Sequence, residues 1–342
     1  MGIMDNAEIE NDIDPESNFF KSMISKCEYY TEEKFNNTIN PSDGISIIHF
    51  NSRSMYKNFD QMETYLNGFK SPFNVIAITE TWGSDEKGMD FFNLAGYDLI
   101  SVNRENKQGG GVALYVDQNM KYKRVNDMTT CIPNLMECVS IEIDMGKKQN
   151  INISSVYRAP KSCIETFNSV MEGLFKRPNQ KLYYVLGDFN CNLLNPKNNK
   201  LTDEFFENMF SMSLIPLITK PTRITARSAT VIDNIFTNNF ECNTTSGILI
   251  NDTSDHLPVF VFFECNLPTG KKSETITFRV KSEENINALN EDLIREEWKD
   301  VYAQCDVNTA FDCFLSKVQY LLDKNCSLRQ GLIITSNQTC HG

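Results

Sequence analysis

The hydrophobic pattern divides the chain into three parts. Residues 1–43 are polar and acidic with little periodicity, which is typical of a partly disordered N-terminal arm. Residues 44–265 contain short apolar or alternating runs, the pattern of buried and half-buried strands. In residues 266–342 the pattern changes to that of a linker followed by a helical extension. We therefore expect one main domain over residues 44–265, with an additional segment on either side.

In the main domain, strands outnumber helices and the two do not alternate strictly. The expected strands lie at residues 45–51, 74–81, 97–102, 111–116, 138–143, 150–157, 181–186, 229–237, 247–250 and 256–264. Apolar residues three or four positions apart predict helices at residues 57–69, 163–175 and 202–214. Strict alternation would indicate a single parallel sheet. The pattern instead predicts an α/β fold of the α+β type, with two packed, mostly antiparallel sheets flanked by helices in a four-layer sandwich.

The helical extension is predicted from two amphipathic segments, residues 284–298 and 308–325. No run of 18 apolar residues occurs, so no membrane span is expected. The first residues are acidic, whereas a secretory signal would begin with basic residues and continue with apolar ones. We therefore expect a nuclear or cytoplasmic protein that is not secreted and has no membrane partner.

The charge distribution is compatible with a nucleic-acid partner although the net charge is −12. Half of the excess lies in residues 1–40, which hold 9 acids and 3 bases, whereas residues 41–265 hold 25 acids and 21 bases. A local basic face fits these counts, but strong non-specific DNA affinity is not expected. The 11 cysteines form no CxxC pair and there are only 3 histidines, so a zinc site of the Cys/His type is not expected.

Polar side chains recur where the expected strands stop. The residues at or next to these ends are Asn51, Glu80, Tyr157, Arg158, Asp188, Asn190, Asp255 and His256. Asp233 lies inside an expected strand and shares one face with Val231 and Ile235. Its carboxylate must therefore be paired, or its pKa rises. Strand ends that meet at one edge of the fold would bring all these groups together.

Several of these residues also have an ordinary structural interpretation. Glu80 can be a solvated loop acid, Tyr157 a core aromatic residue, and residues 187–190 a turn. His49 lies within a buried strand and is interpreted as structural. Glycines 109–111 precede a strand rather than a helix, so they predict a hairpin turn rather than a phosphate-binding loop. These interpretations do not explain why so many polar groups fall at the ends of core strands.

In sequence order, the polar groups resemble the endonuclease/exonuclease/phosphatase superfamily. The matching residues are Asn51, Glu80-Thr81, Tyr157, Gly187-Asp188-Phe189-Asn190, Asp233 and Ser254-Asp255-His256. The closer similarity is to the apurinic-endonuclease-like endonuclease domain of non-LTR retrotransposons. It is carried by the segments FNSRSM, ITETW, GYDLISVNRENKQGGGVALYV, VYRAP and KPTRITARSATVIDNIFTN. Residues 266–325 also resemble the connector that follows this domain in such elements, so the chain is expected to stop before any reverse transcriptase.

The resemblance implies a metal-dependent phosphodiester hydrolase that uses Mg²⁺ or Mn²⁺ and acts on DNA. Hard cations prefer carboxylate and carboxamide oxygens. The implied ligands are Glu80 and Asn51, with Asp255 available for a second or transient ion. The implied catalytic residues are Asn51, Glu80, Tyr157, Asp188, Asn190, Asp233, Asp255 and His256.

The resemblance also implies how these residues divide the chemistry. His256 would face the scissile phosphate, with Asp233 fixing its tautomer. Asn190 and Tyr157 would donate hydrogen bonds to developing negative charge. Asp188 would orient or deprotonate the attacking water, or protonate the leaving oxygen, and the sequence leaves these roles open.

Residues near the motifs are the expected DNA contacts, with solvated surface as the alternative interpretation. They are Arg53, Arg158, Thr222, Arg223 and Arg227. Residues 222–230 are expected to form a loop along a DNA groove. Two residues depart from the superfamily pattern. Arg53 stands where abasic-site endonucleases carry an acid, which argues against abasic-site repair, and Thr79 stands where many relatives have Gln.

A DNA-nicking endonuclease of a retrotransposon-derived protein is the function that this pattern favours. A phosphatase of the same fold, acting on inositol phosphates or lipid headgroups, would share the residues around the phosphate. An inactive remnant is the third alternative. The segments VYRAP and RSATVIDNIF favour nucleic acid, and the presence of every expected catalytic residue argues against a remnant. No protein partner can be inferred.

Overall fold

The chain forms two compact units, one from Ile24–Gly270 and one that includes Lys271–Gly342. The computed structural model describes residues 27–39, 44–83, 89, 91–104, 109–146, 150–176, 181–194, 199–239, 242–264, 273–279 and 283–334. Residues 1–26, most of the predicted N-terminal arm, lie outside the described residues. None of the helices in the described ranges is long and apolar enough to span a lipid bilayer.

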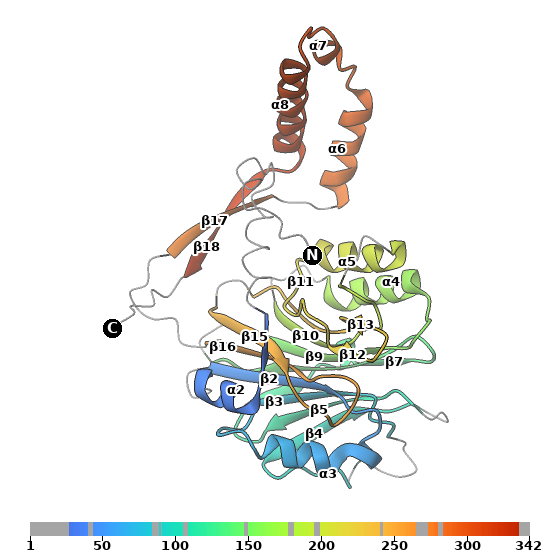
Figure 1. Ribbon diagram of the computed structural model, residues 1–342, viewed down its shortest axis with the longest axis vertical. Coiled ribbons are helices and arrows are strands. Elements are labelled where there is room, and N and C mark those ends of the chain that lie inside the picture. The colour runs from blue at the N-terminus through green and yellow to red at the C-terminus, as the bar shows by residue number, and fades with distance from the viewer. Residues whose placement is uncertain are drawn as a thin grey trace. The chain divides into compact units, whose positions relative to one another are not determined.

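Two mixed β-sheets form the centre of the larger unit (Figure 1). The first has the order β1-β15-β16-β2-β3-β5-β4. Its strands are Glu28–Tyr30 (β1), Thr244–Leu249 (β15), Val259–Glu264 (β16), Gly44–Asn51 (β2), Val75–Thr79 (β3), Val112–Asp117 (β5) and Tyr97–Val102 (β4). Parallel pairing occurs only between β1 and β15 and between β2 and β3, among the pairs described for this sheet.

The second sheet has the order β11-β14-β10-β9-β8-β6, with β7 also paired to β8. Its strands are Ile215–Pro216 (β11), Asp233–Thr237 (β14), Leu182–Asp188 (β10), Ile151–Arg158 (β9), Met136–Ile143 (β8), Tyr122–Arg124 (β6) and Thr130–Ile132 (β7). A short 3-10 helix at Asn126–Met128 precedes β7. Only β9 and β10 pair in parallel among the described strands of this sheet. The prediction of mostly antiparallel sheets is therefore confirmed.

Helices cover the outer faces of both sheets (Figure 1). They are α2 (Glu32–Thr38) and α3 (Met55–Leu66) on the first sheet, and α4 (Ile164–Phe175) and α5 (Lys200–Ser211) on the second. Phe35 and Phe59, from α2 and α3, share a buried cluster with Ile48 of β2. Phe167 and Phe205, from α4 and α5, belong to a separate cluster on the second sheet. This arrangement confirms the predicted α/β sandwich flanked by helices.

Side chains alternate along the central strands, so every second residue points toward the opposite sheet. In β10, Val185 belongs to the cluster beneath the helices, so its neighbours face the first sheet. Tyr184 accordingly stacks on Phe263 of β16, with ring centroids 4.4 Å apart. Ser155 of β9 likewise donates a hydrogen bond across the sandwich to the carbonyl of Ile78 in β3 (3.2 Å). By the same alternation Asp188, at the end of β10, faces the first sheet.

The fold begins earlier than the predicted boundary at residue 44. Strand β1 extends the first sheet, with Tyr29 opposite Ile248 of β15. Tyr30 and Phe35 each pack edge-on against Phe260, with centroids 5.1 and 4.9 Å apart. The hydrophobic pattern misses this segment because only a few aromatic residues in an acidic, polar run carry its burial.

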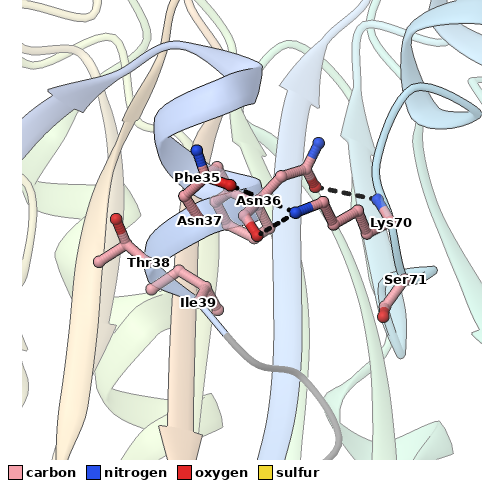
Figure 2. A pocket seen from close by; sticks show the side chains of 7 residues that line it. All are labelled: Phe35, Asn36, Asn37, Thr38, Ile39, Lys70 and Ser71. Carbon is pink, nitrogen blue, oxygen red and sulfur yellow. Dashed lines mark hydrogen bonds between the residues drawn. The ribbon is translucent and has the colours of Figure 1, made fainter.

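Polar contacts also tie α2 to the chain that follows α3, around a pocket shown in Figure 2. The residues lining it are Phe35, Asn36, Asn37, Thr38, Ile39, Lys70 and Ser71. The Lys70 side chain donates to the carbonyl of Asn36 (3.3 Å) and to Oδ1 of Asn37 (3.2 Å). The backbone N–H of Lys70 donates to Oδ1 of Asn36 (2.9 Å). Residues 27–39 are thus an integral part of the sandwich.

The smaller unit contains helices and a two-stranded sheet. Its elements are β17 (Ser273–Arg279), α6 (Glu283–Arg295), α7 (Lys299–Tyr302), α8 (Val307–Asn325) and β18 (Leu328–Ile334). Leu289 of α6 packs with Leu321 of α8 and with Cys326. The predicted helices are therefore present, and β17 and β18 form an antiparallel pair that was not predicted.

Glu142 of β8 joins neighbouring parts of the second sheet. It forms ion pairs with Lys123 of β6 (2.8 Å) and with Lys181, just before β10 (3.1 Å). The hydrogen bond from Lys123, together with that from Lys181, lowers the pKa of Glu142 from 4.5 to about 2 despite burial. A lowered pKa means that these contacts stabilise the fold above pH 4.5 and are lost as the pH falls toward 2.

The Glu142→Gln variant should therefore have a lower free energy of unfolding than the wild type at pH 7. Because both lysines are substantially exposed, we expect a difference of only about 1 kcal/mol. Urea denaturation at pH 7 and pH 3 measures it, and the difference should be smaller at pH 3. An equal difference at the two pH values would contradict the role assigned to the carboxylate.

Candidate active site

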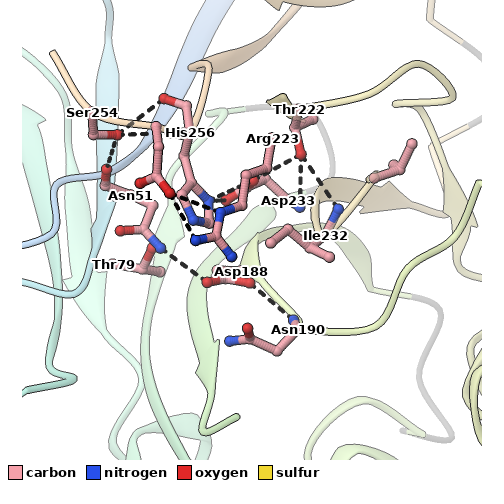
Figure 3. Close-up of polar contacts among 12 residues, drawn as sticks. Asn51, Thr79, Asp188, Asn190, Thr222, Arg223, Ile232, Asp233, Ser254 and His256 are labelled. Atoms are coloured by element: carbon pink, nitrogen blue, oxygen red, sulfur yellow. Dashed lines mark hydrogen bonds and ion pairs between the residues drawn. The ribbon is translucent and has the colours of Figure 1, made fainter. Parts of the chain in front are cut away.

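The ends of four central strands meet at one edge of the sandwich. Parallel strands β2 and β3 end level, which places Asn51 beside Glu80. Parallel strands β9 and β10 also end level, with Tyr157 opposite Asp188. Strand β14 runs antiparallel to β10 and begins opposite Asp188, at Asp233. Residues that are far apart in the sequence therefore share one edge because of strand register (Figure 3).

Asn51 joins the two sheets at this edge. Its Nδ2 donates to Oε1 of Glu80 (3.0 Å) and to Oδ2 of Asp188 (2.9 Å). Because both oxygens bond to one nitrogen, they are at most 5.9 Å apart. In this structure Oδ1 of Asn51 accepts from the backbone N–H of Arg53 (3.1 Å). The sequence places Glu80 and Asp188 in separate motifs, and the fold places their carboxylates around one amide.

Asp233 and His256 form a buried pair on the other side of Asp188 (Figure 3). Nδ1 of His256 lies 2.9 and 3.1 Å from the two carboxylate oxygens of Asp233. Thr222 donates its hydroxyl to the same carboxylate (2.8 Å). Asp188, Asp233 and His256 each offer one ligand atom, and these atoms all lie within 4.8 Å of one another. The three groups are therefore close enough to act on one substrate.

The protonation states of these groups follow from their burial and mutual contact. Burial and the charge of Asp233 raise the pKa of the Asp188 carboxyl well above its usual range. Although burial acts to raise the pKa of Asp233, the charge of His256 and its hydrogen bond lower it. Although burial acts to lower the pKa of His256, the Asp233 carboxylate raises it to about 9. At neutral pH, an ionised Asp233 thus holds a protonated His256. Asp188, beside this pair, retains its proton more readily than an exposed aspartate does.

Asp255 lies next to His256 in the chain but has different partners. Its Oδ1 accepts from Nη1 of Arg53 (2.7 Å), and its Oδ2 accepts from Nε and Nη2 of Arg223 (2.8 and 2.7 Å). Each carboxylate oxygen is therefore engaged by a guanidinium group. This geometry does not support the expected role of Asp255 as a ligand of a second ion, because a cation would have to displace both ion pairs.

Tyr157 and Asn190 lie at the same edge but differ in orientation. Tyr157 is buried, and burial with the charges of Glu80 and Asp188 raises the pKa of its hydroxyl above the usual range. The hydroxyl therefore keeps its proton and can serve as a donor. Asn190, which has a φ of +48°, donates through Nδ2 to the carbonyl of Arg158 (2.8 Å). In this structure, that amide contacts the adjacent loop.

Arg158 does not lie where a DNA contact is expected. Its side chain is buried and donates to the carbonyls of Phe189 (3.4 Å), Asn190 (3.3 Å) and Ser162 (2.5 Å). Its guanidinium carbon lies 5.7 Å from the ring centroid of Phe167. The predicted phosphate contact is corrected accordingly, since these bonds hold the loop after β10 in place.

Thr222, Arg223 and Arg227, three of the remaining predicted DNA contacts, belong to a hairpin beside the His256–Asp233 pair, whereas Arg53 follows β2. Its strands are β12 (Arg223–Ile224) and β13 (Ala229–Thr230), so the strand expected over residues 229–237 is interrupted before β14. Arg227 is exposed in the turn, and Ile224 is 52% exposed. Thr222 is fully buried and contacts Asp233, so a direct DNA contact is not available to it.

Three residues of the site were not singled out from the sequence. Trp82 donates its indole N–H to Oε2 of Glu80 (3.2 Å). Arg104 forms a buried ion pair with Glu137 (2.5 Å) and lies over the ring of Tyr157, 5.6 Å from its centroid. A tryptophan in a loop or an arginine after a strand gives no local signal of such a partner.

The donor set around Asn51 fits a hard divalent cation. The neutral amide of Asn51 is the only group that the described hydrogen bonds place between the Glu80 and Asp188 carboxylates. Two carboxylates that converge without an opposite charge repel each other unless a proton or a cation relieves them. Oxygen donors of this kind suit Mg²⁺ or Mn²⁺. Glu80 is the residue that would hold the ion. Asn51 presents its donor Nδ2 to both carboxylates, so it would join as a ligand through Oδ1 only with its amide reversed.

Sequence comparison finds one matching family model, described as "Endonuclease-reverse transcriptase", over residues 151–260. The matched range includes Tyr157, Asp188, Asp233 and His256. No curated protein gives a significant match to the sequence.

Solved structures with a similar fold include two nucleases. The endonuclease domain of TRAS1, a telomere-specific non-LTR retrotransposon, is 15% identical, with a TM-score of 0.52, and the match covers 65% of this chain and 99% of that domain. The AP endonuclease LMAP from Leishmania major is 12% identical, with a TM-score of 0.55 and coverage of 71% and 95%. These likenesses establish the fold, and with the family match they confirm the resemblance predicted from the motifs.

Proposed function

Because the larger unit has the endonuclease/exonuclease/phosphatase fold and matches the endonuclease-reverse transcriptase family model, we propose that this protein is a metal-dependent DNA-nicking endonuclease. The fold and the family match support hydrolysis of a phosphate ester in general, and the nicking of DNA is the specific proposal. One observation carries it. Asn51 joins Glu80 and Asp188 beside the buried Asp233–His256 pair, which gathers a cation site, a proton-transfer group and a cationic donor at one edge.

A bound Mg²⁺ or Mn²⁺ would supply positive charge that neutralises the phosphoryl oxygens. Glu80 would hold this ion, and Asn51 would join it through Oδ1 with its amide reversed. Nδ1 of His256 is occupied by Asp233, so Nε2 is the ring nitrogen that can donate to a phosphoryl oxygen. The raised pKa of His256 keeps that donor charged at neutral pH.

Asp188 is the group that exchanges a proton with the reacting oxygens. Its pKa is raised by burial and by the charge of Asp233, so its carboxyl can hold a proton that an exposed aspartate would lose. With the attacking water it acts as an orienting group or base, and with the leaving oxygen it acts as an acid. The Tyr157 hydroxyl can stabilise charge that develops on the phosphate.

DNA is the proposed substrate because exposed arginine side chains lie around the reaction site. Arg53 and Arg223 are half-exposed and are tied together by Asp255 next to His256. Two guanidinium groups around one carboxylate leave a positive charge of one. Together with Arg227 on the hairpin, this charge suits phosphates on either side of the bond that is cleaved.

The test of the proposal is the conversion of supercoiled plasmid to nicked circles by the purified full chain. Nicking is expected with Mg²⁺ or Mn²⁺ and should stop when EDTA removes the ion. If plasmid stays intact while phosphate is released from inositol phosphates or lipid headgroups, the protein is a phosphatase of the same fold. Inertness toward all these substrates would support the inactive remnant.

Removal of the Arg227 side chain should weaken duplex DNA binding without affecting the chemical step. An exposed phosphate contact contributes affinity that depends on salt, so Arg227→Ala should reduce the salt dependence of binding by about one ion. Binding measured at several salt concentrations tests this. Arg124→Ala, an exposed arginine on β6, is the matched control and should bind as the wild type does. Equal loss of hydrolysis of bis(p-nitrophenyl) phosphate in the Arg227 variant would contradict a role confined to DNA.

A further inference from the structure

The carboxylate of Glu80 has a different partner on each oxygen. Oε1 accepts from Asn51, whose amide also faces Asp188, whereas Oε2 accepts from the indole N–H of Trp82. Resting on the cation site proposed above, we propose that Trp82 is a positioning residue that presents Glu80 to the ion through a single oxygen and thereby favours Mg²⁺ over Ca²⁺.

The backbone around Glu80 holds both side chains in a restricted conformation. Glu80 and Trp82 each have a φ of +53°, in the left-handed region that is unfavourable for residues other than glycine. Hydrogen bonds on both sides maintain this conformation. The N–H of Trp82 donates to the carbonyl of Gly110 (2.9 Å), and the N–H of Ser54 donates to the carbonyl of Glu80 (2.9 Å).

The glycine-rich turn at residues 109–111 supports the same backbone conformation. Thr81 donates through its backbone N–H to the carbonyl of Gly111 (3.3 Å). Gly111 has a φ of +86°, and a Cβ at this position would lie 2.3 Å from Oγ1 of Thr81. Gly111 must therefore lack a side chain for the turn to approach the segment that carries Glu80 and Trp82. Its function is to hold the indole in place, in addition to connecting β4 with β5.

The chemistry of the two ions explains why a donor on Oε2 matters. Mg²⁺ is small, requires near-octahedral geometry and is bound through one or two carboxylates and water, whereas Ca²⁺ accepts bidentate carboxylates. A bidentate ion needs both oxygens of Glu80. The Asn51 amide can reverse and release Oε1, because it carries an acceptor as well as donors, whereas the indole of Trp82 is only a donor and stays on Oε2. Hydrogen-bond partners of metal ligands typically change metal affinity by about 10- to 100-fold when they are removed.

Trp82→Phe, prepared in the full chain, removes the N–H and keeps an aromatic ring. Binding of Mn²⁺ is measured from the electron paramagnetic resonance signal of the free ion, and Mg²⁺ and Ca²⁺ are measured by competition. We expect the Trp82 variant to bind Mg²⁺ about 10-fold more weakly and Ca²⁺ with little change. The ratio of the two affinities should therefore fall by about 10-fold. Trp298→Phe, which alters the other tryptophan in the smaller unit, should leave the ratio unchanged.

The same titrations separate this inference from the proposed cation site. If the wild type binds no Mn²⁺, or if Glu80→Gln binds as well as the wild type, the cation site itself is overturned. If Glu80→Gln loses binding but the Mg²⁺/Ca²⁺ ratio of Trp82→Phe equals that of the wild type, only the role of Trp82 is overturned.

A fluorescence measurement covers the case in which Trp82→Phe fails to fold. In the Trp298→Phe background Trp82 is the only tryptophan, so its emission reports on the indole beside Glu80. Mg²⁺ should change this emission with the same half-saturation at which it displaces Mn²⁺, and Ca²⁺ should do so only at higher concentration. Emission that is unaffected by Mg²⁺, or that responds equally to both ions, would overturn the proposal.

Discussion

Replacing Glu80 by glutamine should reduce magnesium-dependent nicking of supercoiled DNA at least ~100-fold, the usual scale for losing one electrostatic element of a site. Glutamine keeps the size of the side chain and a hydrogen-bonding group, but it removes the negative charge. Because Asn51 and Trp82 hold the Glu80 carboxylate from two sides, the variant loses a charge whose position is already fixed. The initial rate of nicked-circle formation measures the effect.

Glu207→Gln is the matched control for the Glu80 variant. Glu207 is an exposed acid on α5, outside the strand ends that form the site, and its replacement should leave nicking within about twofold of the wild type. Similar unfolding midpoints for the three proteins would show that the Glu80 variant is folded. A folded Glu80→Gln protein that nicks within threefold of the wild type would rule out Glu80 as the cation ligand.

The second large effect should come from His256, whose replacement by alanine removes the charged donor beside the phosphate. We expect at least ~100-fold slower nicking in His256→Ala. Asp233→Asn provides a sharper test, because it keeps the shape of the pair and removes the charge that raises the pKa of His256. Nicking by the asparagine variant should also be slow, with a changed dependence on pH.

The direction of the pH change follows from the pKa of His256. In the wild type, the protonated imidazole is present below about pH 9 and is lost as the pH rises through that value. Without the Asp233 carboxylate, burial lowers the pKa of His256 and only the smaller effects of Asp188 and Asp255 oppose it, so activity should begin to fall at a lower pH than in the wild type. Rates measured between pH 6 and pH 10 test this. Identical alkaline limbs in the two proteins would contradict the proposed role of Asp233.

Much of the site is visible in the sequence because its residues follow strands with strong local patterns. Asn51, Glu80, Tyr157 and Asp188 all come at or just after apolar runs that form central strands. Their convergence requires only that parallel neighbours end at one edge, which the strand registers show. The N-terminal strand β1 has no regular hydrophobic alternation and was not predicted. The pairing of β17 with β18 was not predicted either: Ile276 and Phe278 alternate with polar residues in β17, but β18 has no such alternation.

The partners of charged side chains, in contrast, are not visible in the sequence pattern. Arg158 and Arg223 look alike in the sequence, as arginines beside a motif. The fold buries Arg158 among backbone carbonyls and pairs Arg223 with Asp255. Asp255 itself follows the expected motif and still contacts two guanidinium groups.

The sequence by itself determined the longer central strands and the helices of the main domain, and it indicated the edge at which the polar groups collect. These features are local, because periodicity and residue type act over a few positions along the chain. The tertiary structure alone decided which groups meet, such as Asn51 with Asp188, 137 residues away, and Arg53 with Asp255, 202 residues away. Such contacts depend on sheet register and on the packing of one sheet against the other, which no local pattern encodes.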